Sequence, residues 1–415
     1  MKKFLSVLLA VLMVFTLAAC NNGGGEADSG ETTSTEGDPI VFGLTTTVTG
    51  DQAAGGQQAE YGSRLAIDEI NEAGGIVLAD GLSHKIELAI EDDQGDKVLC
   101  DTTVRRLVEE KNAAVILGPY FSGQTIALDA TMKELGVALI NSATNVGIDD
   151  LQNPYLWHNR CDDGLNGLIL GKAAIDAYTA KNGSTDGIKV GIICGNDDTG
   201  VGAATVYENY FKENGIDYYR DEHDTTVDDL TAYIQKAIAA GCNCWVSSCH
   251  DKGAVAIAKA MYEQGLRDQI VFMNPILAQT NVLEMMEPEW VEGWACVADY
   301  SASDTSNPLA AEFTKKWTAK YDVTPDVQGA LYYCHTMLAV KAIQDAGSAE
   351  PQAIADAIAK ISGFKTIIGT VYADKYSNLI YEIGITYIRN LVPTMENSVS
   401  MVESQADVAS VAQYH

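Results

Sequence analysis

The sequence predicts an α/β fold of two doubly wound parallel-sheet lobes that are joined by a three-segment hinge. With 415 residues, the chain exceeds the size at which one hydrophobic core stops growing. Short β-branched runs alternate with longer segments of helical period, and this alternation starts again near residue 187. After Gly293 the order changes to consecutive helices followed by late strands, which allows the chain to return to both lobes.

The composition is that of a soluble globular protein. Hydrophobic residues make up 47% and charged residues 20%, which excludes a disordered chain and a multi-span membrane protein. The formal net charge is -30, and no run of Lys and Arg is present that could neutralise a phosphate backbone. We therefore expect neither a nucleic-acid partner nor adsorption to anionic lipid. The role we expect for the high negative charge is to keep the protein soluble.

The first residues are typical of a secretion leader. Residues 1–19 are expected to form a signal peptide, because two lysines precede an apolar run too short to span a bilayer. The small residues before Cys20 resemble a bacterial lipobox, which implies cleavage at this point and a lipid on Cys20. Residues 20–38 are then a lipidated cysteine and a disordered tether, since they contain no large apolar group. This predicts an extracytoplasmic protein, lipid-anchored to the bacterial cell membrane.

The first half of the folded part alternates strands with helices. Strands are expected at 40–44, 85–93, 113–119 and 137–145, and helices at 56–75, 97–110 and about 125–135. The second half repeats this order, with a strand and loop at 187–200, strands at 216–222, 242–250 and 269–275, and helices at 203–215, 228–241 and 254–265. A strand at 294–301, helices at about 307–320, 326–346 and 351–361, and strands near 369–373 and 381–389 complete the chain.

This order predicts where the lobes begin and end. We expect residues 39–160 and 296–370 to form lobe 1, and residues 161–295 and 371–415 to form lobe 2. The chain would then cross between the lobes three times. In open parallel sheets, ligands bind outside the carboxyl ends of the strands, so the loops at these ends are the candidate site.

The cysteines do not predict a metal site, and their number leaves open whether any of them form disulfides. Eight cysteines follow Cys20, and most are single residues within apolar segments, where a thiol behaves as a small hydrophobe. Cys242, Cys244, Cys249 and His250 form a cluster that could be interpreted as a metal site. We expect no metal and no cofactor, because no second cluster completes a tetrahedral set of ligands.

Two loops of the first lobe have the chemistry of an anion site. Ser122 stands just before a helix expected from Thr125, and a hydroxyl with free amides at such a position would bind a carboxylate. The alternative is that Ser122 only caps its helix. Ala143 and Thr144 offer backbone and hydroxyl groups at the end of the next strand. Together the two loops are expected to form an anion cradle.

The chain also resembles a known family from residue 40 to about 390. The matching segments are the long stretch 43–76, IEDDQGD, VILGPYFSGQT, INSATN and KVGII. These resemble the branched-chain amino acid receptors of ABC importers, which are substrate-binding lipoproteins with the type I periplasmic-binding fold.

The resemblance implies a set of binding residues. It implies that Ser122, Ala143 and Thr144 bind the ligand's α-carboxylate. It also implies that loops 197–199, 249–251 and 274–276 contribute from lobe 2. The candidates on those loops are Thr199, His250, Asp251 and Asn274.

Two positions depart from the family pattern. Ile276 stands where the family has an acid for the ligand's ammonium, so either Asp251 takes this role or the ligand lacks an α-amine. Asp251 could instead be a solvated loop acid or a helix N-cap. Gly55 stands where better-known members have a large aromatic residue, and Tyr120 and Phe121 could partly refill that space. This favours an aromatic-lined pocket.

No pattern of an enzyme is present around these residues. Ser122 is not part of a Gly-x-Ser-x-Gly elbow, the six histidines have no metal-hydrolase spacing, and segment 199–205 lacks the third glycine of a dinucleotide loop. We therefore expect a monomeric receptor that captures an amino acid or similar carboxylate by lobe closure and delivers it to the permease of an ABC importer. The alternative is a lipoprotein that presents the bound solute to a signalling receptor.

Overall fold

The computed structural model describes residues 35–50, 52–160, 162–303 and 307–400. By their contacts, the described residues from Glu36 onward form one compact unit. The predicted signal peptide, the lipid on Cys20 and all but the last residues of the predicted tether lie outside the described residues. Within the described residues, no helix is long and apolar enough to cross a membrane.

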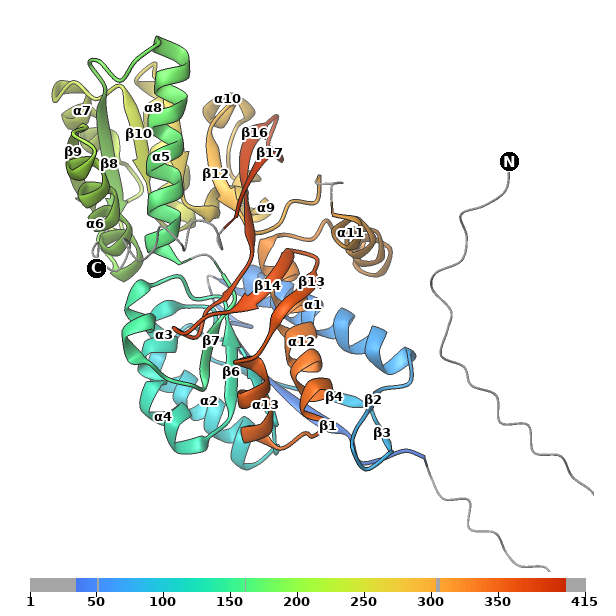
Figure 1. Ribbon diagram of the computed structural model, residues 1–415. Coiled ribbons are helices and arrows are strands. Elements are labelled where there is room, and N and C mark those ends of the chain that lie inside the picture. Colours follow the sequence, from blue (N-terminus) through green and yellow to red (C-terminus); the bar gives the residue numbers. More distant parts are fainter. Residues whose placement is uncertain (1–34, 51, 161, 304–306, 401–415) are drawn as a thin grey trace, which may run out of the picture. The chain divides into compact units, whose positions relative to one another are not determined.

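The first sheet is parallel and has the strand order β4-β1-β5-β6-β7. Its strands are β1 (Ile40–Thr46), β4 (Ile86–Asp92), β5 (Val115–Leu117), β6 (Ala138–Asn141) and β7 (Leu156–His158). The central strands β5 and β6 are buried along their whole length, as parallel strands covered on both faces are. A short hairpin of β2 (Ile76–Val77) and β3 (Ser83–His84) follows the first helix (Figure 1).

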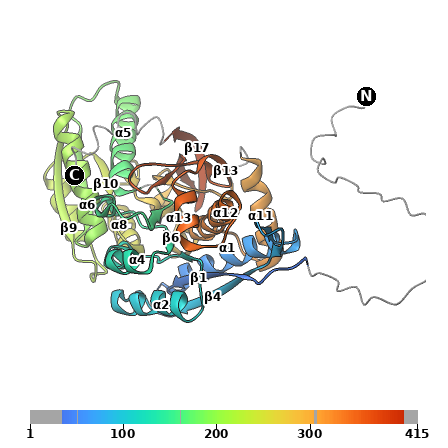
Figure 2. The same ribbon diagram turned by 60° about the horizontal axis from the view of Figure 1, so that its bottom comes forward.

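Helices from two distant parts of the chain cover this sheet. They are α1 (Ala53–Glu72), α2 (Lys97–Glu109), α3 (Ser122–Ala127) and α4 (Asp129–Leu135), joined later by α11 (Pro308–Tyr321), α12 (Val327–Ala346) and α13 (Pro351–Ile358). Helix α12 packs along α1, and Figure 2 shows the two side by side. They approach closely because a Cβ on Gly62 would lie 2.2 Å from the carbonyl oxygen of Gly329.

The second sheet is mixed, with the order β17-β16-β12-β11-β10-β8-β9. Strands β8 (Lys189–Gly195), β9 (Asp217–His223), β10 (Cys244–Ser247), β11 (Ile270–Met273) and β12 (Ala295–Ala298) are parallel. Strands β16 (Glu382–Arg389) and β17 (Val392–Ser400) add an antiparallel edge. The sheet's helices are α5 (Asp163–Asn182), α6 (Asp198–Glu213), α7 (Thr231–Ala239), α8 (Asp251–Glu263), η2 (Pro275–Ala278), α9 (Thr280–Leu283) and α10 (Pro288–Val291).

Three details of the sequence prediction are wrong or incomplete. The single helix expected at 125–135 is two helices, α3 and α4, which meet at Leu128. Ser122 is the first residue of α3 and therefore does not cap it; Phe121 is the N-cap residue. No element was predicted between 146 and 186, where the structure has η1 (Val146–Leu151), β7 and α5.

The chain passes between the two sheets after β7, after β12, and after a small third sheet of β13 (Ser362–Thr366), β14 (Gly369–Ala373) and β15 (Leu379–Ile380). Strand β12 stays in the second sheet to Ala298, three residues beyond the expected end of the first lobe-2 segment at 295. The lobe boundaries themselves stay a prediction.

One buried network joins the three passages. The guanidinium of Arg160, after β7, donates from Nε to Asp299 Oδ2 at 3.2 Å. The hydroxyl of Tyr381, which precedes β16, donates to the other oxygen of Asp299. Asp299, which directly follows β12, is only 3% exposed. The hinge thus has a charged centre to which each passage contributes one residue.

Candidate functional site

A pocket lies at the carboxyl ends of strands from both large sheets. Its lining consists of Tyr120, Phe121, Ser122, Ser142, Thr144, Arg160, Asp163, Thr199, Cys249, His250, Asn274, Pro275, Ile276 and Gln279. Seven of the nine binding residues predicted from the sequence are in this set. Ala143 and Asp251 are not. The position is the one that open parallel sheets use for ligands.

The first-sheet side of the pocket is a cluster of hydroxyls and amides. Ser122 Oγ accepts hydrogen bonds from the backbone amides of Thr144 at 3.2 Å and Asn145 at 3.3 Å. The loops after β5 and β6 are thereby joined. Ala143 is buried behind them, and its amide donates to Asn141 Oδ1 at 2.7 Å. Backbone amides that converge on one point form a ready site for an anion.

An aromatic wall closes one end of this cluster. The rings of Tyr120 and Phe121 meet edge to face, with centroids 4.8 Å apart. A Cβ on Gly55 would lie 3.3 Å from the Tyr120 ring, so Tyr120 occupies the space beside this glycine. Burial raises the pKa of Tyr120 to about 12, which keeps the phenol neutral. Gln279 Nε2 donates to the phenol oxygen at 3.4 Å.

The second-sheet side carries an imidazole and an amide. His250 Nε2 lies 3.0 Å from Asp197 Oδ2, and this hydrogen bond raises the pKa of His250. The His250 ring meets the Phe121 ring edge to face at 6.4 Å. Asn274 bonds the backbone of Cys249 through both ends of its side-chain amide, at 3.1 and 3.3 Å. Asn274 therefore holds the shape of the loop after β10.

Asp251 is engaged elsewhere. It is the first residue of α8, and its Oδ2 accepts a hydrogen bond from Asn281 Nδ2 at 3.1 Å. It does not cap its helix, because the N-cap residue is His250.

The pocket contains two charged side chains that the sequence analysis missed. Arg160 and Asp163 both line it, and Asp163 is only 3% exposed. Asp162 is the N-cap of α5 and accepts a hydrogen bond from the Leu165 amide, which leaves Asp163 as the first helical residue. Burial raises the pKa of Asp163 well above its usual value, although a hydrogen bond with Thr144 acts in the opposite direction. The signal that was overlooked is the acid pair just ahead of a helix.

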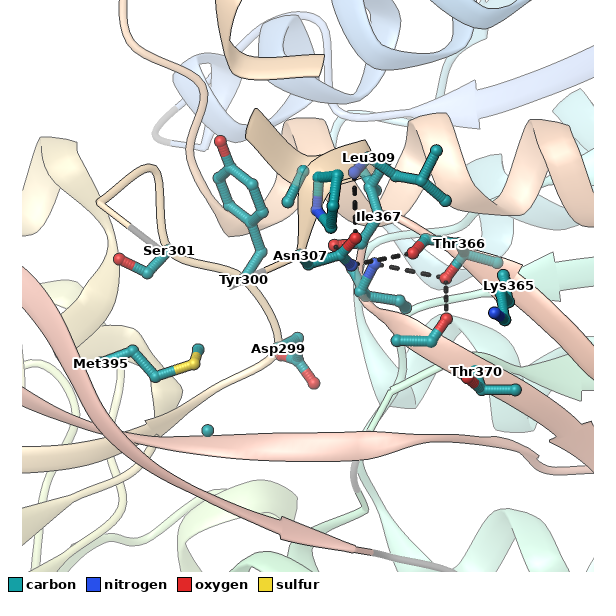
Figure 3. Close-up of a pocket in the computed structure, with 15 residues that line it drawn as sticks. Asp299, Tyr300, Ser301, Asn307, Leu309, Lys365, Thr366, Ile367, Thr370 and Met395 are labelled. Atoms are coloured by element: carbon teal, nitrogen blue, oxygen red, sulfur yellow. Dashed lines mark hydrogen bonds between the residues drawn. The ribbon is translucent and has the colours of Figure 1, made fainter. Parts of the chain in front are cut away.

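A larger cavity, of about 590 Å³, lies among Asp299, Asn307, the β13–β14 hairpin and Met395 (Figure 3). Two of the polar side chains that line it, Asn307 and Asp299, are already hydrogen-bonded within the protein. Asn307 Nδ2 donates to the carbonyls of Thr366 and Ile367 at 3.0 and 3.1 Å, and Asp299 is bonded by Arg160 and Tyr381. For this reason we place the candidate site in the smaller pocket.

Comparison with known proteins decides the family. The sequence model of a family described as periplasmic binding protein matches residues 39–380. The chain belongs to the periplasmic binding protein family. It is thus a binding protein, and the prediction that it is not an enzyme is confirmed by this membership.

The curated relatives of this periplasmic binding protein are distant but of similar length. "Leu/Ile/Val-binding protein homolog 1" of Brucella suis is 26% identical over 81% of this chain and 86% of the relative. "Amino acid binding protein" of Pseudomonas aeruginosa is 23% identical over 84% and 89% of the two chains.

Solved structures confirm the predicted fold class. The branched-chain amino acid transporter substrate binding protein LivJ of Streptococcus pneumoniae, in complex with isoleucine, superposes with a TM-score of 0.76 at 23% identity, over 87% of this chain and 99% of that one. A solute binding protein of an ABC transporter from Rhodopseudomonas palustris, in complex with p-hydroxybenzoic acid, gives 0.75 at 16% identity, over 88% and 97%. At these identities the likeness shows the fold alone.

Proposed function

We propose that this periplasmic binding protein is the extracytoplasmic receptor of an ABC importer for amino acids or related small carboxylates. The observation that carries the proposal is the convergence of Ser122 Oγ with the amides of Thr144 and Asn145 inside the pocket. A ligand carboxylate that settles here would accept a hydrogen bond from the Ser122 hydroxyl, and would also accept one from the Thr144 amide by replacing Ser122 Oγ as the acceptor of that amide. Such charge-assisted bonds are about twice as strong as neutral ones.

The pocket residues of the second sheet, called here the second rim, add contacts to those of the first sheet, the first rim. Thr199, His250 and Asn274 line the same pocket as Ser122, so a ligand bound on the first rim is also within reach of the second. The pocket is narrow, about 60 Å³, because Gln279 and Tyr120 meet across it. We infer that the rims part to admit the ligand, and that the ligand stabilises the form in which it contacts both rims.

The relatives support two classes of ligand. The relatives include Leu/Ile/Val-binding and amino acid binding proteins, and one protein of similar structure was solved in complex with p-hydroxybenzoic acid. Both classes carry a carboxylate, which is the group that the Ser122 cluster suits. The aromatic wall of Tyr120 and Phe121 is compatible with an aliphatic or an aromatic remainder.

The proposal includes the place of the protein in the cell. A lipid on Cys20, with residues 21–38 as a tether, would hold the receptor at the outer face of the cytoplasmic membrane, next to the permease. Release of radiolabelled palmitate by mild alkali from the wild-type chain, and its absence from Cys20→Ser, would support this anchor.

Thermal unfolding with a ligand panel tests the binding function. We expect at least one of the twenty standard amino acids, or p-hydroxybenzoate, to raise the Tm of the purified chain by several degrees at millimolar concentration, because a ligand that binds the folded state stabilises it. The double variant Ser122→Ala, Thr144→Ala should lose this shift. The proposal is contradicted if no compound shifts the Tm, or if the double variant responds as the wild type does.

A further inference from the structure

One carboxylate oxygen in the pocket has no partner in the protein. Asp163 is 97% buried, since its exposed fraction is 3%, and its Oδ2 forms no hydrogen bond with any described residue. The same side chain lines the candidate pocket. Buried polar atoms are almost always hydrogen-bonded, so an exception in a binding pocket calls for an explanation.

Burial of this group is costly without a partner. A carboxylate that moves from water into a protein interior loses its hydration. Only hydrogen bonds to donors can compensate for this loss. The start of α5 recovers part of this cost, because the positive end of the helix dipole favours an acid in the first turn. The free oxygen remains, and a cationic donor is the group that would satisfy it best.

Neither neighbouring cation bonds the free oxygen of Asp163. Arg160 donates to Asp299 at 3.2 Å, and His250 is paired with Asp197 at 3.0 Å. The other acid considered for this role, Asp251, is bonded to Asn281 and lies outside the pocket lining. Within the described part of the chain, Asp163 is therefore the pocket acid that still lacks a donor.

Thr144 places Asp163 beside the carboxylate cradle. The Thr144 amide donates to Ser122 Oγ, while the Thr144 carbonyl accepts from the Asp163 amide at 2.5 Å. One residue thus contacts both the cradle and the acid. In an α-amino acid, the carboxylate and the ammonium are attached to the same carbon. A carboxylate in the cradle therefore brings its own ammonium into the neighbourhood of Asp163.

We propose that Asp163 binds the ammonium group of the ligand, and that this makes α-amino acids, rather than carboxylates without an amine, the preferred ligands. The inference rests on the proposed function and names the ligand class of the same pocket. It also accounts for Ile276, because the acid that is absent from that position is supplied by Asp163 at the start of α5.

The electrostatics agree with this assignment. Burial is the largest influence and raises the pKa of Asp163, followed by the Thr144 hydrogen bond, which lowers it, and by the charge of Asp162, which raises it. An ammonium at the free oxygen would add an opposite charge and lower the pKa again. Ligand binding would then hold the carboxyl in its ionised form.

Calorimetric titration with matched ligands tests the proposal. Each amino acid that raises the Tm is compared with the acid that has hydrogen in place of the amine, for example leucine with 4-methylpentanoate. We expect the wild-type chain to bind the amino acid about 100-fold more tightly than the amine-free acid. The amine-free acid lacks one charge-assisted hydrogen bond and leaves the buried Asp163 unpaired. In Asp163→Asn, the affinity for the amino acid should fall by about 100-fold.

Two controls make the result decisive. Asp163→Asn should keep its affinity for the amine-free acid, which shows that the variant is folded. Glu289→Gln removes one exposed negative charge from the first turn of α10 and should leave both affinities unchanged.

The possible contrary results are distinct. Wild-type binding of amine-free acids as tight as that of amino acids overturns the role of Asp163 but leaves the receptor function standing. Retained amine preference in Asp163→Asn, or its loss in Asp251→Asn instead, also overturns it. A wild-type chain that binds neither class contradicts the receptor function itself.

Discussion

At Ser122, one hydroxyl accepts hydrogen bonds from two backbone amides of the neighbouring loop. Ser122→Ala removes this acceptor, and also removes a donor to the bound carboxylate. We expect the affinity for the ligand to fall by about 10- to 100-fold, since a bond to a charged group contributes about 1.5–3 kcal/mol. Calorimetric titration measures the change.

The matched control is Ser248→Ala. Ser248 Oγ is buried and forms no hydrogen bond with any described residue, and the residue does not line the pocket. We expect this variant to bind as the wild type does. Equal losses of affinity in the two variants would show that the effect of Ser122 is one of packing and not of anion binding.

His250 gives the pocket rim a pH-dependent ion pair. Its pKa is raised, first by the hydrogen bond that it donates to Asp197 and further by the charges of Asp197 and Asp251, against the effect of burial. A raised pKa in the folded state means that the pair stabilises fully below the ordinary histidine pKa, about 6.5, and that this contribution is lost as the pH rises through the raised value. The imidazole is 44% exposed, so solvent screening keeps the effect small.

The expected result for His250→Gln follows from this sign. Urea unfolding should show a larger difference from the wild type at about pH 5.5 than at about pH 8.5. A difference that is constant between these pH values, or that grows with pH, would contradict the pairing.

Residue chemistry could be predicted only where a strand end was recognised. Ser122, Thr144, Thr199 and His250 all line the pocket, and each lies within five residues of the end of a strand. Arg160 and Asp163 follow β7, a strand of three residues that is too short to give a periodic signal. Their proximity to Ser122 is created by the fold and is not visible in the spacing of the sequence.

At the scale of elements, the contact between α1 and α12 depends on the absence of side chains. A Cβ on Gly62 would lie 2.2 Å from the Gly329 carbonyl oxygen and 2.9 Å from the Tyr333 amide nitrogen. Gly62→Ala must therefore push the helices apart, and we expect a loss of about 1–3 kcal/mol in the free energy of unfolding.

Gly202→Ala is the matched control within a helix. Its nearest contact would be Asn145 Nδ2 at 3.9 Å, so the added methyl group has room. We expect a gain of up to about 1 kcal/mol, because alanine favours the helix more than glycine does. A Gly62→Ala variant as stable as Gly202→Ala in urea unfolding would contradict the close packing.

Helices and strands could be predicted where the hydrophobic periodicity of the sequence is strong, and were missed where the periodicity is weak. Helix α5 contains Gly164, Gly167 and Gly171 and buries most of its first turns, so it has neither a clear polar face nor a run of strong helix formers. The antiparallel ribbon of β16 and β17 was half predicted. A strand near 381–389 was expected, whereas β17 follows only after a turn with positive φ at Asn390 and Leu391.

At the scale of the whole molecule, Asp299 joins the three passages between the sheets. Removing it deprives the largely buried guanidinium of Arg160 of this carboxylate and removes the hydrogen bond that Tyr381 donates to it. We expect Asp299→Ala to cost about 3–5 kcal/mol in the free energy of unfolding, as the loss of one partner of a buried ion pair does.

Tyr381→Phe separates the two contacts. It keeps the ion pair and removes one hydrogen bond, which should cost about 1–2 kcal/mol. Urea unfolding of both variants measures the difference. Should Asp299→Ala prove no less stable than Tyr381→Phe, the ion pair would not be the centre of the hinge.

The central claim is that a ligand binds at the facing carboxyl ends of the two sheets, with its carboxylate on Ser122 and Thr144. A crystal structure of the chain with the amino acid that raises its Tm most tests this claim directly. We expect a ligand carboxylate within hydrogen-bond distance of Ser122 Oγ and the Thr144 amide, and an ammonium beside Asp163. A ligand found instead in the larger cavity beside Asn307 and Met395 would contradict it.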